Sequence, residues 1–567
     1  MKHELYVTDA VTTNGSMQNN HASSLASATD KQIVEFTDIV GANGRWQLKI
    51  FILTALSGIS AAWNHLAISF LAFPTDHWCA RPKEINISLN EWFQDYLPNA
   101  TIKGTSHHSQ CQKFVIDNST FTPITTEVES CTVWEYALDF NSIIYKWDLV
   151  CDKEWMISTS QSVYMLGFLF TVFVSGQISD IYGRHFAFMV NVAVLLIAGI
   201  AVAFANSFIM FALCRFFVAV GQAGTTLVAF IIIIEGVGSK QRAKYALLNS
   251  LGWHTGYISL PLVAWLTQDW FALQLAITLP CLLYIPYLWL LPESPRWLLS
   301  KGKLKQALPI LEEIAKLNKV EVKDLESKAK ALSCSDNDGD GKSSAVTVID
   351  LLRTPNLRKK TLCLYFTWVV ISFTYYGLSL NTNDLEGNDY LNFFISGLLE
   401  FPAMFFCLFT MDFLGRKKPL MFCLLTGGLA CFGCMFVPKA LPSVSTILAM
   451  IGKMFTSASF AIIYIYSAEI FPTVARNIGV GSSSTMARVG SAIAPFMRDL
   501  GKVTNPSVPL GIFGVLSIIN SGLLTFMPET NKYPVPETFE QAENFGKKIK
   551  DEETDTPFRI KHVSSVF

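Results

Sequence analysis

Charged residues are scarce in this chain of 567 residues: Asp, Glu, Lys and Arg together make up 16% of it, whereas soluble domains usually carry about a quarter. The formal net charge is −1, and no cluster of Lys and Arg has the size that a nucleic-acid surface needs. The apolar segments also lack paired carboxylates, a His-rich metal motif, and a Ser or Cys beside a His. We therefore expect no nucleic-acid partner, no metal site, no cofactor and no enzymatic activity.

Long apolar runs take up much of the chain. Hydrophobic residues make up 51% and aromatic residues 13% of it. Runs such as Ile50–Phe73 and Phe208–Ile234 have the length of a membrane span, about 20 predominantly apolar residues. The polar N-terminal tail, residues 1–47, lacks the apolar core of a cleaved signal peptide, so we expect the first span to be retained. The pattern predicts twelve transmembrane helices, at residues 48–73, 156–178, 186–205, 208–234, 245–267, 270–291, 361–381, 391–411, 419–437, 445–467, 477–497 and 508–527.

Basic residues in the loops orient these helices. They gather after the second, fourth, eighth and tenth helices: Arg184, Lys240, Arg242, Lys244, Arg416, Lys417, Lys418 and Arg476. The positive-inside rule therefore predicts that the tails 1–47 and 531–567 lie in the cytoplasm, together with the linker 300–360. Within the linker, Asp336–Gly341 resembles the start of a calcium-binding loop. Because Thr347 stands where such a loop needs a Glu, we favour a flexible linker.

The loop after the first helix, residues 74–155, is extracellular on this topology. It contains three glycosylation sequons, at Asn86, Asn99 and Asn118. Its four cysteines suggest two disulfides in an oxidising compartment, with three possible pairings among Cys79, Cys111, Cys131 and Cys151. We expect a glycosylated, disulfide-bonded extracellular domain here.

Three charged motifs occur twice along the chain, in the same order. Gly176–Arg184 after the second helix reads GQISDIYGR, and Asp412–Lys417 after the eighth reads DFLGRK. A Glu precedes an Arg by seven residues after the fourth and tenth helices, and Pro-Glu-Ser or Pro-Glu-Thr ends the sixth and twelfth. This order indicates that the second half of the chain repeats the first. Equivalent residues are 232, 234 and 236 positions apart, at Arg184 and Arg416, Glu235 and Glu469, and Glu293 and Glu529.

The repeated motifs fit a gate. Glycines allow helices to approach closely and turn tightly, and charged residues at helix ends can pair with a neighbouring helix when that face of the protein is shut. The alternative is ordinary loop charge that only fixes topology. We predict a gating role, which stabilises an outward-facing state, for Asp180, Gly183, Arg184, Glu235, Arg242, Asp412, Gly415, Arg416, Glu469 and Arg476.

The motif after the second helix resembles the major facilitator superfamily, whose signature there is Gly-x-x-x-Asp-x-x-Gly-Arg. Pro292–Leu299 (PESPRWLL) is similar to sugar porters and organic-ion carriers, and Trp147–Cys151 (WDLVC) with Tyr375–Asn381 (YYGLSLN) resembles the organic-ion solute carriers. Ala468–Asn477 (AEIFPTVARN) and Gly481–Ser484 are most similar to organic cation/carnitine transporters. The resemblance implies an all-α membrane protein with twelve transmembrane helices in two pseudo-symmetric six-helix bundles, and an extracellular loop domain after helix 1. It also implies alternating access, in which the bundles rock around a central site.

Four ionisable residues lie inside predicted helices, where a charge is costly and therefore indicates function: Arg215, Glu400, Lys453 and Arg488. Glu400 can attract a quaternary ammonium or a proton, or it can form a salt bridge to Lys453 or Arg488 that only holds helices together. In the family that the chain resembles, transporters of cations carry an Asp at the position of Arg488, and those of organic anions or carnitine carry an Arg. Arg488 therefore favours a ligand with a carboxylate. We expect Arg215 to have either a structural role or a role in coupling transport to an ion.

Aromatic faces attract quaternary ammonium groups. Trp368, Tyr375 and Tyr376 belong to the seventh predicted helix. Trp368 lies two helical turns before Tyr375 on a similar face, and Tyr376 directly follows Tyr375. Family pockets are lined by aromatic residues of this helix and by a residue that matches Phe460. The alternative for all four side chains is lipid contact or helix packing. Polar residues that match positions near the family's substrate path are Asn249 and Gln161.

These observations predict a secondary-active or facilitative plasma-membrane transporter of small organic ions, above all organic cations or zwitterions such as carnitine. The alternatives are an organic anion transporter of the same family, or a transporter-like receptor without flux. The coupling ion, sodium or proton, stays open, because Ala223–Thr226 replaces the polar and aromatic residues that carnitine transporters carry there. A monovalent cation needs no coupled ion, since the membrane potential supplies about 2.3 kcal/mol per charge per 100 mV. The last residues, Ser565–Phe567, fit a PDZ-domain partner.

Overall fold

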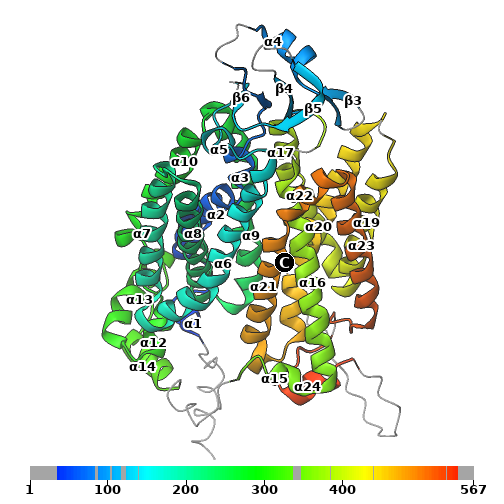
Figure 1. The fold of residues 1–567 in the computed structure, drawn as a ribbon. Coiled ribbons are helices and arrows are strands. Elements are labelled where there is room, and N and C mark those ends of the chain that lie inside the picture. The colour runs from blue at the N-terminus through cyan, green and yellow to red at the C-terminus, as the bar shows by residue number, and fades with distance from the viewer. Residues whose placement is uncertain are drawn as a thin grey trace, which may run out of the picture.

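Helices form along the apolar runs, because a backbone inside a bilayer must satisfy its own hydrogen bonds. The computed structural model describes residues 35–82, 87–102, 105–116, 123–137, 140–335, 346–382, 385–438, 440–531 and 533–546. Its helices stand side by side in two bundles, with a small strand-containing domain at one end (Figure 1). We call this end the loop end, and the opposite end, where the linker helices lie, the linker end.

The first bundle is built from the chain before the linker. A short helix precedes it at the linker end, and its sixth membrane segment is broken into three pieces. The elements are α1 (Phe36–Val40), α2 (Arg45–Leu66), α3 (Ile68–Leu71), α6 (Trp155–Tyr182), α7 (Arg184–Ala203), α8 (Phe208–Gly236), η3 (Ser239–Gln241), α9 (Arg242–Thr267), α10 (Trp270–Thr278), η4 (Leu279–Tyr284) and α11 (Tyr287–Leu290).

The linker and the second bundle follow. The linker contains α12 (Pro295–Ser300), α13 (Leu304–Asn318), α14 (Leu325–Ser335) and α15 (Asp350–Arg353), and the calcium-like run 336–341 lies outside the described residues. The second bundle contains α16 (Pro355–Leu380), α17 (Asp389–Leu398), α18 (Glu400–Leu414), α19 (Lys417–Gly433), η6 (Cys434–Phe436), α20 (Pro442–Ile470), η7 (Thr473–Ala475), α21 (Arg476–Ile493), α22 (Phe496–Val503), α23 (Ser507–Leu523) and η8 (Leu524–Phe526), and α24 (Phe539–Asn544) comes after it.

Each of the twelve predicted spans coincides with helical structure. Among the described residues, nine helical segments are long and apolar enough to cross a membrane, and α2, α9 and α21 do not meet that measure. These three helices bury polar side chains, such as His65 in α2, His254 in α9 and Ser483 in α21. Their lower hydropathy therefore marks helices that face the protein interior, and the number of twelve crossings stays a prediction.

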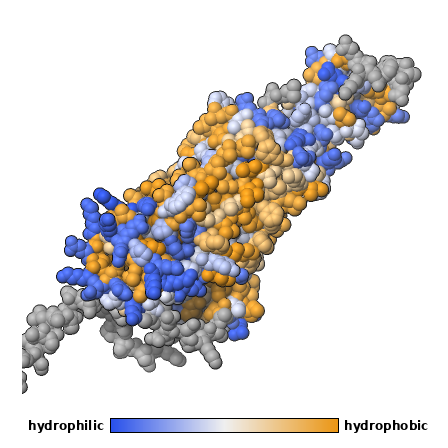
Figure 2. Space-filling view, turned by 90° about the vertical axis from the view of Figure 1, so that its left-hand side faces the viewer, coloured by the Kyte–Doolittle hydropathy of each residue, from blue (hydrophilic) through white to orange (hydrophobic). Residues whose placement is uncertain are grey.

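The surface agrees with a membrane protein. Large apolar side chains are exposed along the helices, including Ile197, Leu283, Trp289 and Phe409. Figure 2 shows hydrophobic surface across the middle of one side of the molecule, with hydrophilic surface toward both ends. An exposed apolar surface of this extent is typical of a protein that is surrounded by lipid.

The eighth membrane segment is broken beside its charged residue. Helix α17 ends at Leu398, and α18 begins at Glu400. Pro402 explains the break, because it has no N–H to donate to the carbonyl oxygen four residues earlier, at Leu398, and its ring crowds that oxygen. Glu400 consequently lies at a helix interruption in the interior of the protein, an arrangement that many transporters use at their binding sites.

The two bundles meet along two helix pairs. Helix α9 of the first bundle packs against α17 of the second, and α6 packs against α21 and α22. Near the loop end, the Ser158 hydroxyl donates to the Pro495 carbonyl over 3.1 Å, and Lys502 forms an ion pair with Glu154. Nearer the middle, Tyr257 and Ser396 share a hydrogen bond of 2.9 Å. These contacts hold the bundles against each other from the loop end to the centre.

The loop domain adds three two-stranded antiparallel sheets to the otherwise helical protein. Strand β1 (His77–Cys79) pairs with β6 (Trp134–Tyr136), β2 (Asn99–Ile102) with β3 (Thr105–His108), and β4 (Gln112–Ile116) with β5 (Pro123–Ser130), the last pair with an irregularity between Phe114 and Val115. Short helical segments complete the domain: α4 (Leu89–Glu91), η1 (Trp92–Tyr96), α5 (Ile143–Trp147) and η2 (Cys151–Lys153). Its own small core surrounds the buried Trp92.

The structure selects one of the three disulfide pairings that the sequence left open. Cys79 pairs with Cys131 and Cys111 with Cys151, with Cα atoms 5.4 and 5.8 Å apart. The first bond joins β1 to the turn between β5 and β6, and the second ties the domain to the segment that leads into α6. Of the glycosylation sequons, Asn86 and Asn118 lie outside the described residues, and only the backbone of Asn99, on β2, is described.

Candidate functional site

The first repeated motif forms a cluster around Arg184 at the linker end of the first bundle. Gly183 makes the turn between α6 and α7 with φ of 110°, a conformation that residues with a Cβ rarely adopt. The backbone N–H of Arg184 donates to Glu293 Oε1 over 2.8 Å. Its guanidinium lies 2.8 Å from Glu235 Oε1 at the end of α8, and 2.7 Å from Asp180 Oδ1.

The same cluster recurs around Arg416 in the second bundle. Gly415 makes the turn with φ of 85°. The backbone N–H of Arg416 donates to Glu529 Oε1 over 2.9 Å, and Nε lies 3.0 Å from Glu469 Oε1 at the end of α20. The two halves of the chain therefore repeat these contacts as well as the sequence motifs. In each bundle, the Glu that follows the last helix accepts a hydrogen bond from the backbone N–H of the Arg.

Both clusters lie within their own bundles. Each joins the turn between two neighbouring helices to the end of a third helix and to the chain that follows the bundle's last helix. Burial opposes ionisation of Glu529, but hydrogen bonds from the backbone amides of Arg416, Lys417, Thr530 and Asn531 outweigh it and lower the pKa of that carboxyl. The motifs that contain Glu293 and Glu529 are visible in the sequence, but we predicted no role for either residue from it.

Other predicted gating residues have different partners. Arg242 pairs with Glu35, just before α1, over 2.6 Å, and not with Glu235. Arg476 donates to the Thr473 hydroxyl over 3.0 Å. The side chain of Asp412 is not among those described. The gating role of all these residues stays a prediction.

A second cluster surrounds Glu400 in the middle of the protein. Glu400 is 3% exposed, and three side chains contact its carboxylate. Lys453 Nζ lies 3.2 Å from Oε1, and the Tyr375 hydroxyl donates to the same oxygen over 2.5 Å. His254 Nε2 lies 3.4 Å from Oε2. Because His254 belongs to α9 and the other residues to the second bundle, this carboxylate lies at the interface between the bundles.

Aromatic rings line the same cluster. Trp253 donates its indole N–H to the Tyr375 hydroxyl over 3.0 Å, again across the bundle interface. The ring of Phe460 lies 5.4 Å from that of Tyr375, edge to face. Tyr257, one turn after Trp253 on α9, is fully buried beside them. A carboxylate with several aromatic faces is the environment that binds an organic cation.

A third cluster lies next to the second and is basic. His65 on α2 is surrounded by the rings of Tyr164, Phe168, Trp253 and Tyr376, at 5.0 to 5.6 Å between centroids. Tyr376 follows Tyr375 in α16, so the two clusters share a wall.

Two arginines complete this basic cluster. The guanidinium of Arg488 lies 3.9 Å from the centroid of the Phe168 ring, and that of Arg215 lies 4.7 Å from the centroid of the Tyr164 ring. Arg215 also donates to Gln161 Oε1 over 2.8 Å. Nε of both arginines and Nε2 of His65 are buried without a hydrogen-bond partner among the described residues. Such donors fit a carboxylate.

The structure therefore separates the residues that the sequence had grouped. Tyr375, Glu400, Lys453 and Phe460 come together in one cluster, and Tyr376, Arg488, Arg215 and Gln161 in the other. Glu400 pairs with Lys453, one of the two partners considered, and Arg488 lies against Phe168 in the neighbouring cluster. Trp368 lies deeper in the second bundle, where its indole donates to Ser467 and its ring packs against Tyr464 at 4.5 Å and Phe460 at 5.9 Å. Asn249 lies one turn before Trp253 on α9, with a buried Oδ1 that has no partner among the described residues.

Six residues of these clusters were not predicted from the sequence: His65, Tyr164, Phe168, Trp253, His254 and Tyr257. A signal was present, because a histidine inside an apolar helix is unusual and the three residues on α9 lie within five positions of one another. The partners of these side chains come from helices that are distant in the chain, so the sequence alone did not distinguish them from packing residues.

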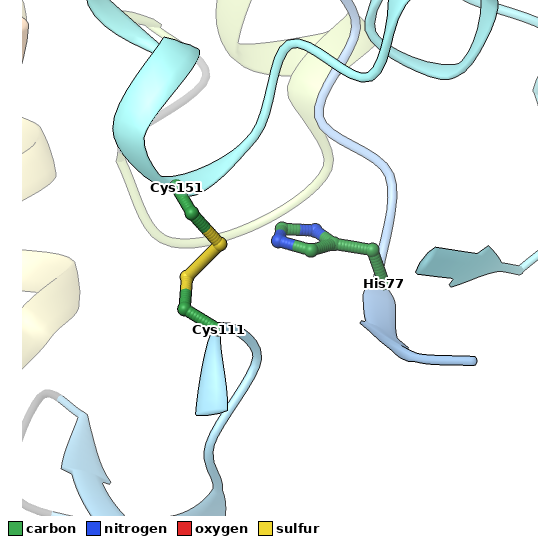
Figure 3. Close-up of side chains that lie close together, drawn as sticks. All are labelled: His77, Cys111 and Cys151. Carbon is green, nitrogen blue, oxygen red and sulfur yellow. A yellow bond between two sulfur atoms is a disulfide. The ribbon is translucent and has the colours of Figure 1, made fainter. Parts of the chain in front are cut away.

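One further cluster has the composition of a metal site but lacks its chemistry. In the loop domain, ligand atoms of His77, Cys111 and Cys151 lie within 4.8 Å of one another (Figure 3). Both sulfurs are used in the bond between Cys111 and Cys151, so neither is a thiolate donor. Burial lowers the pKa of His77, whose ring packs beside the disulfide.

Comparisons with known proteins agree with this geometry. Residues 103–500 match the family model described as "Sugar (and other) transporter". The chain is 38% identical to the "Organic cation transporter protein" of Drosophila melanogaster, over 91% of this chain and 95% of the relative. It is 33% identical to "Solute carrier family 22 member 3" of Mus musculus (89% and 94% covered) and 32% identical to the human "Organic cation/carnitine transporter 2" (89% and 93%). The fold matches that of the xylose transporter XylE from E. coli in a partially occluded inward open conformation, with a TM-score of 0.57, 15% identity, and 86% and 99% of the two chains covered.

Proposed function

Because the chain belongs to the sugar (and other) transporter family of the major facilitator superfamily, we propose that it carries small organic cations across the plasma membrane. It is a multi-pass membrane transporter and not an enzyme. Two relatives whose names include organic cation transporter, and which the chain matches over almost their whole length, support the proposed class of substrate.

One observation carries the proposal: a buried carboxylate lies at the bundle interface among aromatic rings. Glu400 supplies the negative charge, and Tyr375, Trp253 and Tyr257 supply the apolar and π-rich surface. A quaternary ammonium cannot donate hydrogen bonds, so it is held by charge and by ring faces. Alternating access needs its site at such an interface, because movement of the bundles then exposes the site to either side.

A second candidate substrate is a zwitterion that carries a carboxylate, such as carnitine. The basic cluster favours it, since Arg488, Arg215 and His65 have buried donors without partners beside the acidic cluster. A ligand that spans both clusters would place its ammonium near Glu400 and its carboxylate near Arg488. The relative named as an organic cation/carnitine transporter supports this candidate.

The two substrates differ in what drives them. A cation accumulates with the membrane potential, at about 2.3 kcal/mol per charge per 100 mV, whereas a zwitterion needs a coupled ion or exchange. We favour potential-driven transport of cations without sodium or proton coupling. The Arg184 and Arg416 clusters would stabilise the outward-facing state, in which the linker end is closed.

Uptake in oocytes tests the function. We expect wild type to take up radiolabelled tetraethylammonium without sodium, and less of it when the cells are depolarised with potassium. Glu400→Gln should lose at least about tenfold of this uptake at equal surface expression, whereas Glu386→Gln, an exposed carboxylate at the loop end, should lose none. No uptake of tetraethylammonium by surface-expressed wild type would overturn the cation proposal.

The same assay with carnitine and a dicarboxylate separates the candidates. If a zwitterion is the substrate, carnitine uptake exceeds that of tetraethylammonium, and Arg488→Asp abolishes carnitine uptake while sparing the cation. Uptake of the dicarboxylate alone would instead favour an anion transporter. Binding of all three without any flux would favour a receptor.

The orientation belongs to the same proposal. We place the loop end outside the cell and both termini in the cytoplasm, on the distribution of basic residues. Terminal epitope tags should therefore be reached by antibodies only after permeabilisation. Glycosidase treatment should increase gel mobility, and removal of all three sequons, at Asn86, Asn99 and Asn118, should abolish that shift. Deletion of Ser565–Phe567 should release a bound PDZ domain, if the carboxyl end docks by strand addition.

A further inference from the structure

Lys453 occupies the place where the ammonium of a substrate would bind. It lies in the middle of α20 and is 1% exposed. Its Nζ lies 3.2 Å from Glu400 Oε1 and donates to the Ser379 hydroxyl over 2.5 Å. The same atom lies 3.2 Å from the centroid of the Tyr375 ring and 5.2 Å from that of Tyr257. A carboxylate and two aromatic faces thus surround a cation that belongs to the protein itself.

A substrate cation cannot bind Glu400 while the Lys453 ammonium is in this position. Both would need the same oxygen and the same ring face, and two like charges at that separation repel strongly inside a protein. A buried ammonium is also expensive to leave without a partner. Binding of a cation therefore requires that Lys453 moves to another polar position.

The structure provides space for such a movement. A small cavity with room for a water-sized group lies beside Lys453. Most of its lining is apolar, from side chains such as Leu378, Leu385, Met450 and Leu510, and its polar groups come from Asn381, Thr382 and Ser396. Ala449 lies one turn before Lys453 on the same helix. An ammonium headgroup is about the size of a water molecule, and the flexible four-carbon side chain of Lys allows it to turn from Glu400 into this cavity.

We infer that Lys453 is a tethered competitor of the substrate: it rests on Glu400 in the empty transporter and turns into the cavity lined by Asn381, Thr382 and Ser396 when an organic cation binds. This inference rests on the proposed transport of cations. It assigns Lys453 a role in selectivity. Sodium and potassium ions are strongly hydrated and gain little from the apolar site, so they do not displace the lysine. Organic cations gain apolar contacts as well as the attraction of the carboxylate, so they displace the lysine.

Binding of tetraethylammonium to the purified full-length protein in nanodiscs tests the inference. Lys453→Met removes the competitor and should lower the Kd about tenfold. Lys453→Arg keeps the charge pair but is too large for the cavity, so it should raise the Kd about tenfold. Ala449→Leu fills the cavity and should raise the Kd several-fold, and should have no effect in the Lys453→Met background. Matched controls on the surface are Lys301→Met and Ala440→Leu, which should leave the Kd unchanged.

The results distinguish this inference from the proposed function. Failure of wild type to bind tetraethylammonium overturns the proposed function. If wild type binds and Lys453→Met binds equally well or more weakly, the tethered competitor is wrong and the charge pair only holds α18 and α20 together. If Lys453→Met does not fold, Lys453→Arg and Ala449→Leu decide, because both keep the pair with Glu400: a raised Kd in both supports the inference, and an unchanged Kd in either overturns it.

Discussion

His254 Nε2 lies 3.4 Å from Glu400 Oε2, and the two side chains come from different bundles. Next to them, Trp253 of the first bundle donates to Tyr375 of the second. The contact between His254 and Glu400 thus joins the bundles at the level of the candidate binding site. Under the proposed alternating access the bundles separate on one side at a time, so we expect this contact to belong to one conformational state and to change in another.

His254→Ala should weaken the state in which the loop end is closed. Loss of this buried polar contact should change the equilibrium by about 1 kcal/mol, or roughly fivefold, the order of one hydrogen bond. The reporter is a cysteine at Ser158, which faces Pro495 across the bundle interface. Its labelling by a membrane-impermeant maleimide should become several-fold faster in His254→Ala. Thr255→Ala, which changes an exposed position on the same helix, serves as the control and should label like wild type. Equal rates in all three proteins would contradict the role of His254.

Arg184→Ala should lower uptake far more than Asp180→Asn does. The Arg184 side chain is 10% exposed and bonded to three segments, whereas that of Asp180 is 71% exposed. Exposed ion pairs contribute little. We expect a loss of about tenfold or more for Arg184→Ala and less than about twofold for Asp180→Asn, with surface delivery largely intact for both.

The second bundle provides an independent check of the gating role. Arg416→Ala should reproduce the effect of Arg184→Ala, because the contacts of the two residues repeat. Normal uptake in Arg184→Ala and Arg416→Ala would remove the gating role from both clusters and leave them a role in topology alone.

Glu529→Gln should lower the thermal stability of the protein by a few degrees. The ionised carboxyl accepts four backbone amides, and its pKa lies below the ordinary value of 4.5. A carboxyl with a lowered folded-state pKa stabilises the protein fully above its unfolded pKa, and this contribution is lost as the pH falls through the folded pKa. The difference in Tm between wild type and Glu529→Gln should therefore be constant at neutral pH and shrink only below a pH of about 4.5. Glu537→Gln, exposed in the same tail, should have the Tm of wild type at all pH values.

The disulfide pairing gives a prediction for the loop domain. Cys79→Ser should leave Cys131 free to react with an impermeant maleimide, and Cys111→Ser should leave Cys151 free. Each double variant that removes a whole pair should show no extra labelling. Loss of either bond should destabilise the loop domain by about 2–4 kcal/mol. Labelling of Cys151 in Cys79→Ser would show that the pairing is different.

The sequence predicted the positions of the membrane helices because hydropathy along a helix depends on local composition. It predicted the internal repeat for a similar reason: a Gly at a tight turn and an Arg at a helix end are needed wherever that turn recurs, so the motif survives in both halves. The same reasoning indicated that Glu400 and Arg488 matter, since a charge inside an apolar helix must have a partner.

The identity of those partners depended on the tertiary structure. Lys453 is 53 residues from Glu400 and His254 is 146 residues from it, and only the packing of α18 against α20 and of α9 against α17 brings them together. The division into an acidic and a basic cluster, with Tyr375 and Tyr376 facing different ones, arises from the direction of each side chain on a helix. By itself, the sequence determined a two-fold repeated bundle of membrane helices with charges in its interior. Only the tertiary structure decided which charges meet, because burial makes partners of side chains that spacing along the chain cannot relate.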